Sequence, residues 1–414
     1  MNCAIKSKSR SLRGKEHYAF SDDNARMRSI IQSLEESKIR EVANAGLGRE
    51  GVLPFWFGES DEVTPEFIRQ AAMDSLQAGD TFYSHNLGLP ALREAVAQYA
   101  NKLHQPISAD RIGITAGGVN ALMLACQTLI DAGDEVVAVT PVWPNLIAQP
   151  LIMGAKLRCV SLAPDAHGAW QLDVQKLLDA VTRSTKLLVL NAPNNPTGWT
   201  LTRAEQEMIL SHCRKTGTWI LADEVYERLY FKGDTSNGCA PSFLDIANAQ
   251  DRVITVGSMS KSFLMTGWRV GWLVMPTGMS AQVGKLIEFN TSCSPVFIQK
   301  AAAIALQRTS EVTPHIVAHL HACRDKLVGL LQDTQGVKVA AAPGGMYAFF
   351  QLAGHTDALL TAKRLVLEAG IGLAPGNAFA PEGEGWLRWC FASKDLARLD
   401  EGVQRLKAWL SQKN

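Results

Sequence analysis

The sequence lacks a strong net charge. Its 41 Lys and Arg residues are balanced by 40 Asp and Glu residues, which leaves a formal net charge of +1 over 414 residues. A protein that binds nucleic acid or an anionic membrane through an overall basic surface needs an excess of positive charge. We therefore expect neither nucleic acid nor a membrane among its partners.

Paired cysteines and uninterrupted apolar runs are also missing. The 8 cysteines include no C-x-x-C pair, and most stand among apolar residues, which is typical of reduced thiols in an intracellular protein. The uncharged stretch 136–155 is interrupted by three prolines, so no membrane-spanning helix is expected. Residues 1–20 are basic and have no apolar core, which argues against a secretory signal and leaves a transit peptide open. We expect a flexible basic tail and a cytoplasmic location.

Motifs for metal binding and for a serine nucleophile are absent as well. The chain has no H-E-x-x-H, no His and Cys cluster with ligand spacing and no G-x-S-x-G, so we expect neither a metal centre nor a hydrolase elbow. The composition that remains is that of an ordinary globular protein, with 47% hydrophobic and 20% charged residues.

From residue 112 onward, short apolar runs alternate with helical stretches. The runs are 112–115, 135–140, 186–191, 219–223, 253–258 and 270–275. Runs this short, apolar on both faces, predict strands of a mostly parallel sheet that is covered by helices. After about residue 300 the pattern predicts a second, smaller α/β layer. At the other end of the chain, residues 25–43 are predicted to form one helical stretch.

Lys261 comes shortly after the apolar run 253–258, in the segment that begins at Ser258 and ends at Arg269. A lysine where a strand ends in an α/β sheet lies on the ligand side, where burial and a nearby cation lower its pKa. Such a lysine is a candidate for Schiff-base formation. Arg269 and the Ser258 hydroxyl are suited to a phosphate. Taken alone, the fragment also fits a surface lysine and a structural arginine.

Four further features accompany this lysine. Gly118 and Val119 open an apolar helix after a strand, where N–H groups and the helix dipole attract a phosphate. Asn195 stands in an N-P-T-G turn that can hold a cis proline and aim the amide inward. Asp223 ends the run 219–223, and a buried carboxylate there needs a cation such as a protonated ring nitrogen. Arg388 is a charged residue inside an apolar run, which indicates a functional arginine. The alternative interpretation is that Arg388 is an exposed residue of an edge strand.

In this order and spacing, the motifs resemble the class I and II aminotransferases, which are pyridoxal 5'-phosphate (PLP) enzymes of fold type I. The resemblance extends from about Gly58 to the C-terminus. It implies PLP as cofactor and an α/β fold, with a large domain built on a mostly parallel, helix-covered sheet and a smaller α/β domain built from both chain ends. We expect the tail over residues 1–20, a segment of the small domain over 21–60, the large PLP-binding domain over 61–300 and the small C-terminal domain over 301–414.

The resemblance implies a role for each matched residue. Lys261 matches the lysine that holds PLP as a Schiff base and transfers the proton during catalysis. Asp223 matches the carboxylate that keeps the pyridine nitrogen protonated, so that the ring can accept electrons. Asn195 and Tyr226 match the two donors to the phenolic oxygen of PLP, and Trp143 matches the aromatic residue stacked on the ring.

The phosphate and substrate ends of the family's site are matched too. Four residues match the phosphate-binding group: Ser258, Arg269, Gly118 and Val119. Arg388 matches the arginine that binds the substrate α-carboxylate through two hydrogen bonds, with Gly58 and Asn195 at the same end. Tyr83, five residues before Gly88, matches a tyrosine that reaches the phosphate of the neighbouring subunit. The resemblance therefore implies a homodimer with shared active sites.

Two positions depart from the family pattern. Ser60 stands where the family usually has a proline, which should loosen a turn and change little chemistry. Val119 stands where aspartate-specific relatives tend to carry a lysine aimed at the distal carboxylate of the substrate. Strict aspartate specificity is therefore not expected, although another cation could replace that lysine. Val119 and tryptophans such as Trp143 favour an aromatic or neutral amino donor.

The implied activity moves an amino group between an L-amino acid and a 2-oxo acid by a ping-pong mechanism. Two alternatives use the same features. A carbon–sulfur β-lyase of this fold has the same PLP-binding residues, and PLP-binding domains of transcription regulators resemble aminotransferases. The regulator is disfavoured because the residues before Gly58 show one helical stretch, whereas a winged helix-turn-helix needs at least two further elements.

Overall fold

The computed structural model describes residues 27–233 and 238–412. The chain divides into two compact units, Met1–Glu35 and Glu36–Asn414. The predicted basic tail over residues 1–20 lies outside the described residues. The single helical stretch predicted over 25–43 is wrong in its described part, because α1 (Ser29–Gln32) and α2 (Lys38–Ala45) are separate helices. The Ser37 side chain starts the second helix by accepting a hydrogen bond from the Arg40 N–H at 3.3 Å.

A seven-stranded sheet forms the centre of the larger unit, in the order β2-β10-β9-β8-β7-β3-β4. Its strands are β2 (Ile112–Thr115), β3 (Glu135–Thr140), β4 (Lys156–Ser161), β7 (Thr185–Asn191), β8 (Trp219–Asp223), β9 (Val253–Ser258) and β10 (Gly271–Val274). Only β10 runs antiparallel to its neighbours, β2 and β9. The predicted mostly parallel sheet is therefore confirmed, and each predicted run lies within one residue of its strand.

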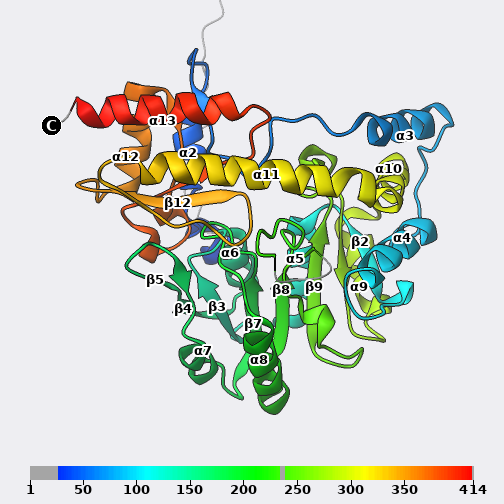
Figure 1. Cartoon of the computed structure of the whole chain (residues 1–414). Coiled ribbons are helices and arrows are strands. Elements are labelled where there is room, and N and C mark those ends of the chain that lie inside the picture. The colour runs from blue at the N-terminus through cyan, green and yellow to red at the C-terminus, as the bar shows by residue number, and fades with distance from the viewer. Residues whose placement is uncertain (1–26, 234–237, 413–414) are drawn as a thin grey trace, which may run out of the picture. The chain divides into compact units, whose positions relative to one another are not determined.

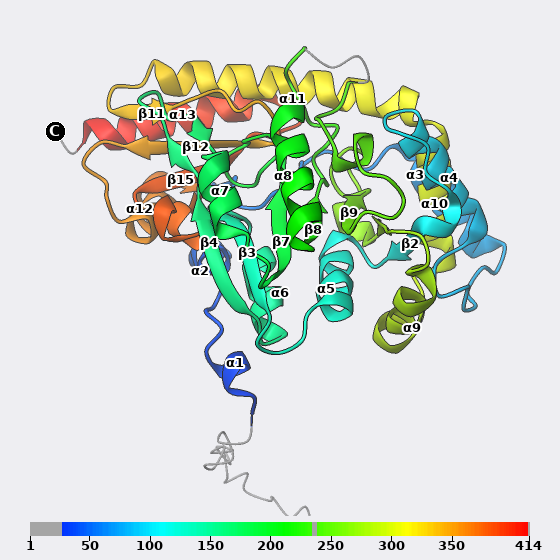
Figure 2. The same ribbon diagram turned by 90° about the horizontal axis from the view of Figure 1, so that it is seen from below.

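Helices cover both faces of this sheet (Figure 1 and Figure 2). Successive side chains of a strand point to opposite faces, so Val136 and Ala138 belong to one buried cluster and Val137 and Val139 to another. The first cluster includes side chains of α5 (Gly118–Leu129), α6 (Asn145–Ile152) and α9 (Ser280–Thr291). The second includes side chains of α7 (Val174–Ala180) and α8 (Arg203–Thr216). Strands buried on both faces explain the continuous apolar runs in the sequence.

A smaller antiparallel sheet has the strand order β11-β12-β15-β14. Its strands are β11 (Val337–Val339), β12 (Tyr347–Leu352), β14 (Ala374–Pro375) and β15 (Trp386–Cys390). The long helix α11 (Thr309–Gln332) contacts it and packs along α13 (Leu396–Ser411) (Figure 1). Helix α12 (Ala358–Arg364) continues into a π-helical turn, Leu365–Ala369.

An early segment of the chain packs against this smaller sheet. Strand β1 (Leu53–Pro54) pairs in parallel with β13 (Ile371–Gly372), and α2 contacts both α12 and β14. Residues 36–414 nevertheless form one compact unit. The division into a large domain over 61–300 and a small domain over 301–414, joined by part of 21–60, stays a prediction.

The remaining elements connect these layers. They are α3 (Glu66–Gln77), α4 (Pro90–Asn101), α10 (Val296–Gln307), the β5 (Ala163–Pro164) and β6 (Trp170–Gln171) pair, and the 3₁₀ turns Ala109–Arg111, Phe243–Asp245, Thr266–Trp268, Gly376–Ala378 and Pro381–Gly383. Helix α10 packs against both α3 and α4. Within residues 27–233 and 238–412, no helix combines the length and the apolar character needed to cross a membrane.

Candidate active site

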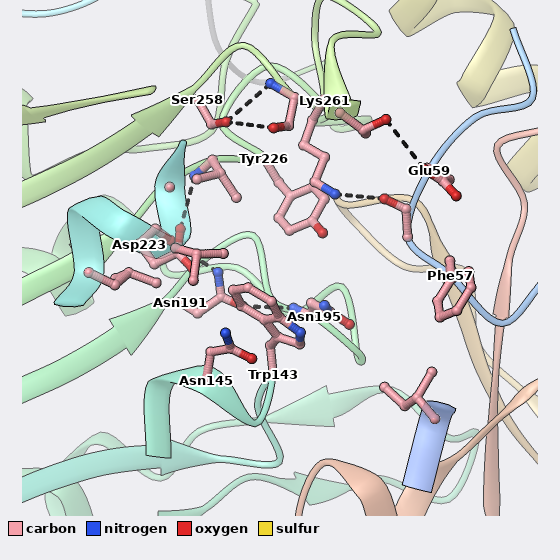
Figure 3. A pocket seen from close by; sticks show the side chains of 18 of the residues that line it. Phe57, Glu59, Trp143, Asn145, Asn191, Asn195, Asp223, Tyr226, Ser258 and Lys261 are labelled. Atoms are coloured by element: carbon pink, nitrogen blue, oxygen red, sulfur yellow. Dashed lines mark hydrogen bonds between the residues drawn. The ribbon is translucent and has the colours of Figure 1, made fainter. Parts of the chain in front are cut away.

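A cavity of about 650 Å³ opens where β7, β8 and β9 end, and it is lined by Asn191, Asp223 and Ser258 from those strands (Figure 3). Eleven of the twelve residues predicted from the sequence line it: Gly58, Gly118, Val119, Trp143, Asn195, Asp223, Tyr226, Ser258, Lys261, Arg269 and Arg388. The twelfth, Tyr83, is 88% exposed and does not line this cavity. Ligand sites in α/β sheets lie at the carboxyl ends of the strands, which is where these residues meet.

Lys261 projects into the cavity from the turn that follows β9 (Figure 3). Its Nζ donates a hydrogen bond to the Gly58 carbonyl at 2.6 Å and lies 5.4 Å from the centre of the Tyr226 ring. Burial lowers the pKa of Lys261 to about 8, and the nearby Arg388 charge acts in the same direction. The neutral amine is the nucleophilic form, so this lowering favours covalent chemistry near neutral pH.

Asp223 is the last residue of β8 and is only 2% exposed. It is in register with Asn191 of β7 and Val256 of β9, so its place is fixed by both neighbouring strands. Burial raises the pKa of Asp223 to about 7, against the effects of a backbone hydrogen bond from Val225 at 3.4 Å and of the Lys261 charge. A carboxylate with so little hydrogen bonding in a buried place favours a cation in the cavity.

The loop after β7 brings Asn195 to the cavity. The Asn195–Pro196 peptide bond is cis, as the turn sequence allowed. The Asn191 side chain holds the loop, because its Oδ1 accepts from the Asn195 N–H at 2.8 Å and its Nδ2 donates to the Asp223 carbonyl at 3.1 Å. Trp143, in the loop after β3, also lines the cavity (Figure 3).

One end of the cavity is rich in donors for an anion. Helix α5 begins at Gly118, so its first N–H groups have no acceptor within the helix. Gly117 has φ 84°, and a Cβ at this position would collide with the Arg269 guanidinium, which therefore packs directly over the loop. The Ser258 hydroxyl lies 2.9 Å from that of Ser260. Helix N–H groups, hydroxyls and a guanidinium together are suited to a phosphate.

Arg388 marks another part of the cavity and is 2% exposed. Its strand, β15, lies between β12 and β14, so the alternative of an exposed edge strand is wrong. Nη1 donates to Asn195 Oδ1 at 2.8 Å and Nη2 donates to the Trp56 carbonyl. The guanidinium carbon lies 4.4 Å from the ring centre of Tyr347 and 4.8 Å from that of Phe379. Its Nε is buried without a hydrogen-bond partner, so a donor remains for a bound carboxylate.

Tyr226 and Tyr347 meet through their hydroxyl groups at 2.6 Å. Burial raises the pKa of Tyr347 to about 12 and that of Tyr226 well above its ordinary value. Both phenols therefore stay protonated and can donate hydrogen bonds. Gly58 is required opposite them, because a Cβ there would collide with the Tyr347 hydroxyl.

Twelve lining residues were not predicted from the sequence: Ser37, Ile39, Arg40, Phe57, Glu59, Leu122, Asn145, Asn191, Val225, Ser260, Thr266 and Tyr347. Some are neighbours of a predicted residue in the chain, as Phe57 and Glu59 are of Gly58, and could have been predicted for that reason. Tyr347 and Arg40 have no such signal, because folding brings them to the cavity from distant segments.

Comparison with known proteins shows to which family the chain belongs. The sequence pattern of aminotransferase class I and II matches residues 53–406. This chain belongs to that family. The aminotransferase is 32% identical to aromatic-amino-acid aminotransferase 2 of Thermococcus litoralis, over 92% of this chain and 98% of that protein. It is 31% identical to an aspartate aminotransferase of Thermotoga maritima, over 92% of this chain and 97% of that protein.

Solved structures have the same fold as this aminotransferase. The aspartate aminotransferase of Thermotoga maritima matches with a TM-score of 0.85 and 30% identity, over 93% of this chain and 100% of that chain. An aromatic aminotransferase from Pyrococcus horikoshii matches with a TM-score of 0.81 and 27% identity, over 90% of this chain and 99% of that chain. The predicted fold class, the α/β fold type I of PLP-dependent transferases, is confirmed.

Proposed function

We propose that this aminotransferase binds PLP in the described cavity and moves an amino group between an L-amino acid and a 2-oxo acid by a ping-pong mechanism. One observation carries the proposal. Lys261 and Asp223 line a single cavity whose lining also includes an anion-binding group, at Gly118, and a buried arginine, Arg388. A phosphate-bearing aldehyde cofactor and a carboxylate substrate need this combination of side chains.

The residues present fit PLP at each of its functional groups. Asp223, buried and poorly hydrogen-bonded, would hold the protonated pyridine nitrogen. The start of α5 with Ser258 and Arg269 would bind the phosphate, and Lys261 would bind the aldehyde carbon. Bound in this way, PLP supplies an electron sink for the negative charge that develops at the substrate α-carbon.

The chain's own groups would then orient the substrate and move protons. Arg388 would bind the substrate α-carboxylate, while its bond to Asn195 at 2.8 Å keeps the guanidinium in place. Once the substrate amino group has replaced Lys261 at the aldehyde carbon, the freed amine, whose pKa is lowered to about 8, would take the proton from the substrate α-carbon and deliver it to that carbon of the cofactor. Asn195 and Tyr226 would donate to the phenolic oxygen of PLP, and Trp143 would stack on its ring.

We propose that the enzyme prefers an aromatic or neutral amino donor and is not strictly specific for aspartate. Apolar side chains line much of the cavity, among them Ile39, Phe57, Leu122 and Val119. The names of similar proteins cover both classes, since one acts on aromatic amino acids and another on aspartate. The carbon–sulfur β-lyase alternative uses the same PLP-binding residues and is separated by its products.

The test is to incubate the PLP-loaded protein with a panel of amino acids and with 2-oxoglutarate as acceptor. We expect glutamate to form together with the 2-oxo acid of each accepted donor. Formation of pyruvate and ammonia without glutamate would contradict the transfer reaction and favour β-elimination.

A homodimer with shared active sites forms part of the proposal. Tyr83 is 88% exposed and its neighbour Phe82 is 82% exposed, both in the loop between α3 and α4. Phe289 on α9 is 87% exposed. Large apolar side chains this exposed support a protein–protein contact, through which Tyr83 would reach the phosphate in the neighbouring subunit. The cytoplasmic location stays a prediction.

A further inference from the structure

The cavity contains one cation that the proposed function leaves without a role. Among the described residues, four cationic side chains line it: Arg40, Lys261, Arg269 and Arg388. The last three are accounted for by the aldehyde, the phosphate and the α-carboxylate. Arg40 belongs to a different part of the chain, the first turn of α2.

The Arg40 guanidinium has no hydrogen-bond or ion-pair partner in the part of the chain that the structure describes, residues 27–233 and 238–412. Apart from bonds within the helix backbone, Arg40 makes one hydrogen bond, from its backbone N–H to Ser37 Oγ. Its guanidinium carbon lies 5.8 Å from the centre of the Phe57 ring, which also lines the cavity. The adjacent Glu41 is instead paired with Lys363 at 2.5 Å. Arg40 is thus an exposed, uncompensated charge at the cavity.

Glu59 is an acidic residue that also lines the cavity, and its partner is a residue other than Arg40. Glu59 accepts a hydrogen bond from the Thr266 hydroxyl at 3.3 Å, on the side of the cavity where Lys261 lies (Figure 3). The position that could have carried a cation at the start of α5 is Val119. Arg40 is therefore the cation that remains for a second negative charge on a substrate.

Arg40 and Arg388 are linked through one short stretch of chain. Arg388 Nη2 donates to the carbonyl of Trp56, and the Arg40 guanidinium lies against the ring of the next residue, Phe57. Neighbouring Cα atoms are only about 3.8 Å apart. Arg388 and Arg40 therefore contact adjacent residues of the chain, Trp56 and Phe57, and both arginines line the cavity.

We propose that Arg40 is a specificity-determining residue that binds the side-chain carboxylate of a dicarboxylic substrate, either an acidic amino acid or its 2-oxo acid. The inference rests on the proposed aminotransferase function. It assigns one of the two substrates in the ping-pong cycle to the acidic class, while the apolar lining formed by Ile39, Phe57 and Leu122 accommodates a neutral or aromatic partner. Charge-assisted hydrogen bonds to a guanidinium provide the selectivity.

The test compares Arg40→Gln with wild type and with Lys38→Gln as the matched control. Lys38 is on the same turn of α2, donates to the Asn377 carbonyl at 3.4 Å and does not line the cavity. We measure kcat/KM of the amino-acid half-reaction for L-glutamate, L-aspartate, L-alanine and L-phenylalanine. Because Arg40 is exposed, we expect about a tenfold loss for the two acidic substrates, an unchanged value for the neutral ones, and partial recovery in Arg40→Lys. Lys38→Gln should match wild type.

Three results would overturn the assignment of Arg40. One is an equal loss for acidic and neutral substrates, and a second is no loss for either. The third is a wild-type protein that converts neutral amino acids but neither glutamate nor aspartate. Each differs from failure of the proposed function, in which wild type transfers the amino group of no amino acid to a 2-oxo acid. The absorbance of bound PLP in Arg40→Gln shows separately that the site has folded.

Discussion

Replacement of Arg388 by lysine perturbs substrate orientation while the positive charge is kept. In the structure, the guanidinium donates to Asn195 and to the Trp56 carbonyl and keeps its Nε free. A lysine ammonium cannot match this planar fork. The Arg388→Lys variant should lose one hydrogen bond to the substrate carboxylate and leave one buried acceptor of the protein without its donor.

The size of the effect on kcat/KM follows from the first loss alone. A hydrogen bond to a charged group contributes about 1.5–3 kcal/mol, which corresponds to about a 10–10²-fold loss in kcat/KM. The unsatisfied acceptor is present in the free enzyme as well as in the transition state, so its cost of about 1–3 kcal/mol lowers the free energy of unfolding instead. We expect this loss in kcat/KM in the single-turnover reaction with every amino acid, and an unchanged affinity for PLP.

The matched control is Arg398→Lys. Arg398 is paired with Asp61, is 28% exposed and does not line the cavity, so its variant should keep wild-type kcat/KM. A loss below fivefold in Arg388→Lys, or a parallel loss of PLP affinity, would refute the assignment of Arg388 to the substrate carboxylate.

Three further predictions concern the cofactor, the subunit contact and the buried charges. Asp223→Asn should lower kcat by about 10²–10³-fold with PLP still bound, because a neutral amide cannot stabilise a protonated ring nitrogen; near-wild-type turnover would argue against this role. Tyr83→Phe should weaken PLP affinity about tenfold in a protein that sediments as a dimer, and unchanged affinity in equilibrium dialysis would exclude the shared site. His104 is buried between Asp245, at 2.7 Å, and Glu227, at 3.2 Å. Burial opposes its charge, but these hydrogen bonds prevail and raise the pKa of His104 to about 10. Its stabilising effect is then complete below pH 6.5 and lost as the pH rises through 10, so His104→Gln should lower the free energy of unfolding by about 3–5 kcal/mol at pH 6 and by less at pH 10. Urea unfolding curves at both pH values measure this loss. An equal loss of unfolding free energy at pH 6 and at pH 10 would contradict the prediction.

The parallel sheet was predictable because its strands are buried on both faces. Strands β3, β7, β8 and β9 appear in the sequence as apolar runs, and their boundaries follow from those runs. Strand β4 was not predicted, since it is an edge strand whose Lys156 and Arg158 are exposed. The break between α1 and α2 was not predicted either, because Ser37 was not recognised as the residue that caps the start of α2.

The part of the site near the strand ends was predictable for a geometric reason. Asp223 and Ser258 end neighbouring parallel strands, and Asn195 and Lys261 follow such strands shortly afterward, so sequence position fixes where they lie. Arg40 and Tyr347 could not be predicted, because tertiary packing alone brings α2 and β12 to the cavity. The burial of Arg388 could not be predicted either, since it depends on packing against the rings of Tyr347 and Phe379.

The central claim is that Lys261 is the residue that binds PLP covalently. The direct measurement is borohydride reduction of the PLP-loaded protein, followed by proteolysis and mass spectrometry of the pyridoxyl-labelled peptide. We predict a single labelled lysine, Lys261, and no stable label in Lys261→Ala. A pyridoxyl group on another lysine, with Lys261 unmodified, would contradict the account.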